Sequence, residues 1–513
     1  MRTDLRLFKP KAWGPRHRPG PEAAVPTGLL AEFLAGDTAV GESFFDESPQ
    51  AAAARTPLAG RLLSLDGHVL REELDPALAA RGVLFGSADR LLAEHGELFR
   101  RHWFTVIDSA CDWFASLHAA FHAASVVLYV PPGVRIAEPL HVLSALGDGG
   151  VDTAHVLVVL GEGAEATVLT ETAGGGSGSG LHCGGTEIVV GRDAFLRMVN
   201  LQNWGAGVWH FARQKAVVHE NGRLQWTLGA LGSRLSQVAQ DVALVGRAAS
   251  AQVNGVMFTE GRQQLVYNTL QHHEAPGCKS DLLYKGGLQD RSRLVWRGMI
   301  KVDKAAQKTD GYQRNDNLML SREARADSIP GLEIEADDVR CTHGATSGRV
   351  DEEQIFYAQA RGLSADEAAR LVVAGFFQQV FDRITILPVR EALARAIGSR
   401  IRRISCSSVA SPSERSVMPE FVRVADVSEV ADPGKLLVEV NGDVVALFHV
   451  EGRFYALDDI CTHDGGPLVD GELVGHKIAC PRHGAKVDIR TGAALSMPAV
   501  RPTRSHAVKV ENG

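Results

Sequence analysis

The pattern of apolar and polar residues changes character along the 513-residue chain. Between residues 27 and 124, apolar residues recur at three- and four-residue steps, as at 88–102 and 112–123, which predicts a helical region. From 125 to 350 the pattern becomes a series of short β-like runs separated by Gly, Asn and Asp. Helical spacing returns within 351–404, so a second helical region is expected there.

The β-like runs between 125 and 350 are too numerous for a single β-sandwich, and helical signals between them are almost absent. A solenoid, in which each coil stacks on the preceding one, accounts better for this pattern, although no clean repeat period is visible. The predicted fold class is therefore mainly β, with a β-helix core and flanking helical segments.

Changes in composition indicate the flexible segments and domain boundaries of the chain. Residues 1–26 are rich in Pro, Arg, Gly and Lys and predict a flexible N-terminal arm. A Gly- and Ser-rich insertion at 174–185 predicts a surface loop, and the Ser-rich stretch 405–418 predicts a linker. Residues 419–513 are expected to form a separate small antiparallel β domain.

The formal net charge of −7 gives no indication of nucleic-acid binding, and no apolar run is long enough to span a bilayer. The seven cysteines are scattered and odd in number, which is not typical of a disulfide framework. Cytoplasmic localisation is the simplest expectation, since no secretion signal is visible. Three of these cysteines have no partners in sequence and predict no chemistry: Cys111, Cys183 and Cys406.

Near the C-terminus, two short motifs each combine one cysteine with one histidine. The first is Cys461-Thr-His463 and the second is Cys480-Pro-Arg-His483. Two Cys and two His also suit a zinc site, but zinc fingers usually group like ligands together. One Cys and one His on each glycine-containing loop favours a [2Fe–2S] cluster, with the cysteines on one iron and the histidines on the other. From about Pro419 to the end, the sequence resembles a Rieske ferredoxin domain.

Before the linker, distinctive motifs are concentrated between 271 and 361. They include Ile329-Pro330-Gly-Leu-Glu333 and Cys341-Thr-His343-Gly-Ala-Thr346. With these motifs, residues 103–393 resemble the SufB/SufD family of iron–sulfur cluster assembly scaffolds, and SufD in particular. The resemblance implies a right-handed parallel β-helix, a SufB-like partner subunit, and a SufC-like ATPase bound by the helical region 351–404.

The resemblance also implies that His343 is a ligand of a nascent cluster formed where the SufB and SufD β-helices meet. The SufB cysteine of that site would fall within 310–320, which contains no cysteine here. Cys341 and His343 alternate along an expected strand and so face the same side, where they could share a metal. On spacing alone a buried Cys and a polar loop His are favoured; the resemblance reverses this for His343 and leaves Cys341 open.

Other potential ligands have weaker support. The run His272-His273-Glu274 has no second ligand cluster at suitable spacing, so a solvated or structural role is favoured. Cys278 beside Lys279 could be an activated thiol, but a structural role is again favoured.

Two motifs are missing from the sequence: a phosphate-binding Gly-x4-Gly-Lys-Ser/Thr loop and a dinucleotide-binding Gly-x-Gly-x-x-Gly. ATP hydrolysis is therefore expected in a partner, and electrons are expected from a separate reductase. The expected function is a non-enzymatic assembly scaffold with a tethered Rieske electron carrier. The alternative is a ferredoxin component of an oxygenase chain, with the β-helix as a docking module.

Overall fold

The computed structural model describes residues 24–34, 55–175, 179–401, 421–440, 443–463 and 465–511. The chain divides into two compact units, 1–406 and 407–513, and each is described by itself. Most of the predicted arm, the predicted linker and Cys406 lie outside the described residues.

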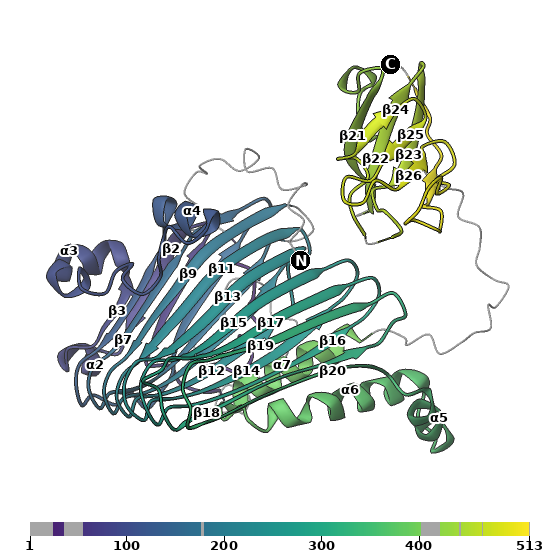
Figure 1. Cartoon of the computed structure of the whole chain (residues 1–513). Helices are drawn as coiled ribbons and strands as arrows, with labels where there is room; N and C mark the ends of the chain where they lie inside the picture. Colours follow the sequence, from purple (N-terminus) through teal and green to yellow (C-terminus); the bar gives the residue numbers. More distant parts are fainter. Residues whose placement is uncertain are drawn as a thin grey trace. The chain divides into compact units, whose positions relative to one another are not determined.

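The first unit is a parallel β-solenoid with two long sheets (Figure 1). From β8 onward, even-numbered strands lie in one sheet and odd-numbered strands in the other, so each coil contributes one strand to each sheet. The first sheet has the order β2 (His68–Leu74), β1 (Gly60–Leu65), β5 (Leu140–Leu146), β8 (Glu165–Gly174), β10 (Phe195–Trp204), β12 (Arg223–Ala230), β14 (Ser250–Thr259), β16 (Lys279–Leu288), β18 (Thr309–Met319) and β20 (Val339–Arg349).

The second sheet runs in the same direction along the solenoid. Its order is β3 (Leu84–Ser87), β4 (Val126–Val130), β7 (His155–Leu160), β9 (Gly180–Val190), β11 (Val208–Val218), β13 (Leu235–Leu244), β15 (Gln264–His273), β17 (Arg293–Val302) and β19 (Arg325–Ile334), and the short β6 (Val151–Asp152) pairs with β9. The mainly β prediction with a parallel solenoid core is confirmed.

The coils differ in length, which explains why no repeat period is visible in the sequence. Trp209 pairs with Leu235, 26 positions further on, whereas Arg293 pairs with Arg325, 32 positions further on. Strands still stack in register because the differences fall in the turns between them. Alternate residues face inward and form a continuous apolar core, as Leu224, Trp226 and Leu228 do in β12.

The solenoid is capped where the chain enters it. There β2 pairs antiparallel with β1, and β3 pairs antiparallel with β4. The prediction of a helical region over 27–124 is wrong for β1, β2 and β3, which lie between Gly60 and Ser87. Asp66 and Gly67, both at positive φ, form the turn between β1 and β2. An Asp-Gly pair in this conformation is a strong hairpin signal, and it outweighs the weak helical spacing around it.

Helices flank the solenoid on two sides (Figure 1). α6 packs on the outer face of β14 and β16, while α4 packs on β9 and β11. α6 begins with a capping box in which Ser364 and Glu367 each bond the other's backbone N–H. The helices are α2 (Pro76–Ala80), α3 (Ala88–Phe99), α4 (Trp113–Phe121), α5 (Glu352–Ala360), α6 (Ala365–Phe381) and α7 (Leu387–Arg400).

A single buried carboxylate fixes the loop between α3 and α4 to the solenoid. Glu187 in β9 accepts hydrogen bonds from the backbone N–H groups of Phe104, Val106 and Ile107, each at 2.7 Å. Its other contact is His155 Nε2 at 3.2 Å. Because the carboxylate is completely buried, these donors replace the water that it loses on folding.

The second unit contains two small antiparallel sheets. Their strands are β21 (Gly434–Val440), β22 (Asp443–Val450), β23 (Arg453–Asp458) and β27 (Ser505–His506) in one, and β24 (Glu472–Val474), β25 (Lys477–Ala479) and β26 (Lys486–Asp488) in the other. A short 3-10 helix, η2 (Val427–Glu429), precedes them. None of the helices in the described segments has the length and apolar character needed to cross a bilayer.

Candidate metal centres

The two Cys/His loops of the second unit have the same backbone geometry. In the first loop, Cys461 N donates to Gly466 O at 2.7 Å, and Gly465 N donates to Cys461 O at 2.8 Å. In the second loop, Cys480 N donates to Ala485 O and Gly484 N donates to Cys480 O, both at 2.8 Å. Gly465 and Gly484 have φ values of 75° and 73°, which non-glycine residues rarely adopt. The two halves of the motif therefore fold as structural equivalents.

The ligand side chains are arranged in two layers. Cys461 and Cys480 are each 1% exposed and belong to the core of this unit. His463 and His483 are exposed, and their ring centroids lie 4.8 Å apart. A two-iron cluster with mixed ligands needs two thiolates on one iron and two imidazoles on the other, and these four residues fit that requirement.

A third loop supports the first cysteine loop. Thr462 Oγ1 donates to the backbone oxygen of Arg501 at 2.6 Å. The loop that contains Arg501 also carries two strongly exposed apolar side chains, Met497 and Val500.

The end of the solenoid opposite the cap is open. β19 and β20 are each the last strand of their sheet, and no strand in the described ranges pairs with their outer edges. Inward-facing residues that would be core in any earlier coil are exposed here. Leu332 and Ile334 of β19 are 37% and 40% exposed. Their partners in the preceding coil, Ile300 and Val302, are fully buried.

The predicted ligand His343 lies on this open coil. It pairs in β20 with Gln313 of β18, which is fully buried, yet His343 itself is exposed. Cys341 lies two residues earlier on the same inward-facing side and is half-buried. Burial raises the pKa of the Cys341 thiol. The structure thus places both residues on one face, as their alternation predicts.

The run at 272–274 divides between the two sides of the solenoid wall. His272 faces outward, with its ring nitrogens 3.1 Å from Glu274 Oε1 and 2.9 Å from Asp303 Oδ1. His273 faces inward and is fully buried. Cys278 is also fully buried, and its thiol donates to Gly246 O at 3.2 Å, in line with a structural role. In the described part of the chain, no three His, Cys, Asp or Glu side chains converge on one ion-sized point.

Two family models match the chain. The model of the SUF system FeS cluster assembly SufBD core domain matches residues 142–376. The Rieske [2Fe–2S] domain model matches residues 420–507. The chain carries a SufBD core domain followed by a Rieske [2Fe–2S] domain.

Curated relatives agree with the SufBD core. Iron–sulfur cluster assembly SufBD family proteins of Staphylococcus epidermidis and Staphylococcus saprophyticus are each 29% identical over 336 residues, which is 65% of this chain and 72% of theirs. A SufBD family protein of Staphylococcus aureus is 28% identical over the same length. These names concern the SufBD family as a whole and do not separate SufB from SufD.

The solved structures that are similar to part of this chain include two ferredoxins. The ferredoxin of carbazole 1,9a-dioxygenase from Nocardioides aromaticivorans is 31% identical, with a TM-score of 0.18, and the match covers 18% of this chain and 89% of that one. The Sphingomonas yanoikuyae ferredoxin is 34% identical with the same TM-score, covering 18% of this chain and 93% of that one.

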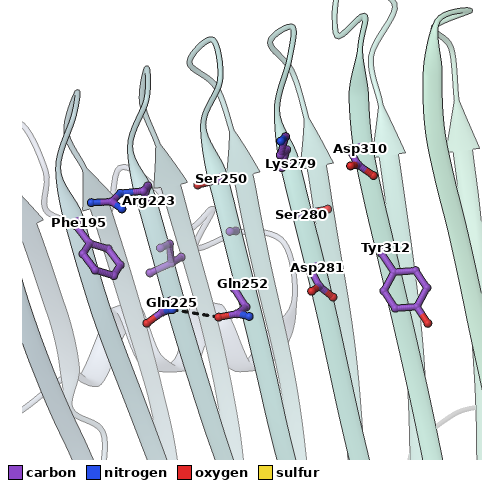
Figure 2. Close-up of a pocket in the computed structure, with 12 residues that line it drawn as sticks. Phe195, Arg223, Gln225, Ser250, Gln252, Lys279, Ser280, Asp281, Asp310 and Tyr312 are labelled. Carbon is purple, nitrogen blue, oxygen red and sulfur yellow. Dashed lines mark hydrogen bonds between the residues drawn. The ribbon is translucent and has the colours of Figure 1, made fainter. Parts of the chain in front are cut away.

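A groove of about 490 Å³ crosses the SufBD core at the beginnings of β10 to β18 (Figure 2). Arg223 and Lys279 lie on its rim, and the guanidinium of Arg223 stacks on the Phe195 ring at 4.5 Å. Gln225 and Gln252 are joined by a hydrogen bond of 3.1 Å across its floor. None of the predicted ligands lines this groove, and sequence motifs gave no indication of it because its residues come from five separate coils.

Proposed function

We propose that the chain is the SufD-like subunit of a SufBCD-type assembly scaffold, with its Rieske domain acting as a tethered one-electron carrier. The observation that carries this proposal is the open terminal coil beside His343. A second solenoid could continue the stack there, placing its own ligands next to that imidazole.

The edge of the coil suits such a junction. β20 is eleven residues long and contains no proline, and alternate residues direct unpaired N–H and C=O groups to its outer edge. β19 contains Pro330, which supplies no N–H and is typical of an edge strand. Exposed Leu332 and Ile334 add apolar surface beside both edges. Backbone pairing along β20, with apolar contacts at its side, would bind a β-rich partner by strand addition.

Assignment to the SufD position rests on the ligands available. The region 310–320, where a SufB-like chain would carry its cysteine, has none in this sequence. The chain therefore offers His343 and requires a partner that offers a thiolate. We assign the SufC-like ATPase to the outer face of the C-terminal helices, where three apolar side chains are more than half exposed: Phe356, Tyr357 and Leu371.

The Rieske domain gives the scaffold a redox function. Assembly of clusters from ferrous iron and sulfane sulfur consumes electrons, and no dinucleotide-binding motif is present in the sequence. A carrier joined to the scaffold by a short linker acts at a high local concentration. A bound [2Fe–2S] cluster would supply one-electron chemistry, and Cys461, Cys480, His463 and His483 would hold it. Electrons would come from a separate reductase.

The test is co-expression of the full chain with SufB-like and SufC-like subunits under anaerobic conditions. We expect a stable complex that forms clusters, and we expect His343→Ala to reduce cluster formation at least tenfold without dissociating the complex. Cys461→Ser should slow assembly when reductase is the only electron source, but not when dithionite is supplied. Co-purification with an oxygenase instead of the two Suf partners would support the alternative function and refute this one.

A further inference from the structure

Two side chains from distant parts of the sequence border one small space inside the terminal coils of the solenoid. His273 is the last residue of β15, and Cys341 lies near the start of β20. Between them is Gly311 of β18, which pairs with Cys341. A methyl group in place of the Gly311 hydrogen would lie 3.2 Å from Cys341 Sγ and 3.6 Å from His273 Nε2. The thiol and the imidazole therefore border the same small space, which exists because residue 311 has no side chain.

The surroundings keep the His273 ring neutral and ordered. The ring is fully buried, and burial lowers its pKa to about 4, an effect reinforced by the neighbouring His272 and only partly offset by Asp310. Nε2 lies 2.8 Å from Ser280 Oγ, which in turn accepts a hydrogen bond of 2.8 Å from Gln271 Nε2. Nδ1 is buried and has no partner.

We propose that Cys341 and His273 form an inner binding site for a divalent transition-metal ion, behind the exposed His343. A thiolate and a neutral imidazole are a donor pair that suits Fe²⁺, Co²⁺ and Zn²⁺. On binding, the thiol proton is released to solvent and a metal–sulfur bond forms, with no change of oxidation state. Nε2 exchanges its Ser280 hydrogen bond for the metal.

A site with two protein donors leaves positions open for water, sulfide or a third ligand. This weak coordination suits a site that passes its ion on. Access is from the open end of the solenoid, where β20 is the last strand of its sheet and Cys341 is half-buried. The assignment of Fe²⁺ as the natural ion, held ready for His343, rests on the proposed function; metal binding itself does not.

The test measures alkylation of Cys341 in the full-length protein with its Rieske cluster in place, using Co²⁺ as the probe metal. The modified Cys341 peptide is quantified by mass spectrometry across a Co²⁺ titration. We expect saturating Co²⁺ to slow alkylation at least tenfold. His273→Gln should raise the apparent Kd for Co²⁺ at least tenfold, and Gly311→Ala should do the same by filling the space while leaving both donors intact.

Matched controls separate this effect from general disturbance of the fold. His272→Gln changes the adjacent, outward-facing histidine, and Gly348→Ala adds a methyl group on β20 where nothing lies within 4 Å. Both should behave like the wild type, and all variants should show unchanged circular dichroism. The proposal is overturned if Co²⁺ gives no protection, if His273→Gln and Gly311→Ala are protected normally, or if only His343→Ala removes protection. The measurement needs no partner subunit, so its failure would leave the scaffold proposal standing.

Discussion

Replacing Leu332 by aspartate tests whether the open end of the solenoid is a docking surface. In the free chain the side chain is 37% exposed, so an aspartate can reach water and the cost to folding should stay near 1 kcal/mol. In a junction with a second solenoid, the same carboxylate would be buried without a partner. Breaking or mispairing a buried charge costs about 3–5 kcal/mol, which corresponds to at least a hundredfold loss of affinity.

The apolar contribution can be estimated separately. Leu332 and Ile334 are 37% and 40% exposed. Taking about 170 Å² for a fully exposed aliphatic residue, they present roughly 130 Å², and burial at about 25 cal/mol per Å² stabilises a junction by roughly 3 kcal/mol. Replacing both by alanine should therefore weaken the junction by up to about 3 kcal/mol, less than the effect of one buried aspartate.

Isothermal titration calorimetry with a SufB-like subunit measures both effects, and thermal unfolding of the free chain checks its stability. Val474→Asp in the Rieske domain is a suitable control, since Val474 is an equally apolar side chain, 64% exposed, on the other unit. If Leu332→Asp binds as tightly as Val474→Asp, the terminal coil is not the junction. If it unfolds the free chain, Leu332 is a core residue and the reasoning from its exposure is wrong.

Three further predictions concern stability and the Rieske centre. Glu187→Ala should destabilise the first unit by about 3–5 kcal/mol in urea unfolding, because three N–H groups, one buried and two partly buried, lose their acceptor. Glu162→Ala, which removes an exposed ion pair with Arg192, should cost less than 1 kcal/mol. Burial lowers the pKa of His118 to about 3 and those of His182 and His273 to about 4. The stability that these neutral histidines provide above pH 6.5 is therefore lost as the pH falls to about 4, and each histidine contributes up to roughly 3 kcal/mol to the free energy of unfolding. His182→Gln should flatten this pH dependence. Asp152, with its pKa raised to about 6 by burial, acts with the opposite sign between pH 4 and 6. Cys480→Ser should abolish the electron paramagnetic resonance signal of the reduced Rieske centre and lower the iron content by two per chain, while the secondary structure of the SufBD core is unchanged; an unaltered signal would remove Cys480 from the ligand set.

Local motifs were the most predictable part of this chain. The Rieske loops are predictable because both ligands of each half lie within four residues and the required glycines follow directly. The strand pattern of the core is equally local, since each run alternates over ten or so positions. The hairpin formed by β1 and β2 is signalled only by the pair Asp66-Gly67, and the helical spacing of the apolar residues around it predicts a helix instead.

Long-range stacking could not be predicted in the same way. His273 and Cys341 border the same space only because β15, β18 and β20 stack in a particular arrangement across coils of unequal length. A shift of one residue in any turn would move one of them to the other side of the wall. His273 is an inward-facing residue next to an outward-facing histidine, and the sequence presents the two as equivalent.

The difference between the two ends of the solenoid determines how large an assembly can grow. At one end the sheets finish in the antiparallel strands β2 and β3, while at the other end they finish in the parallel strands β20 and β19. A solenoid that can dock through only one of its ends binds one other solenoid and then offers no docking surface for a third. A chain that docks only through its open coil, as proposed above, would form closed pairs and would avoid the fibres to which β-structures with two free ends are prone. The antiparallel strands at the entrance would thus limit the assembly to two solenoids.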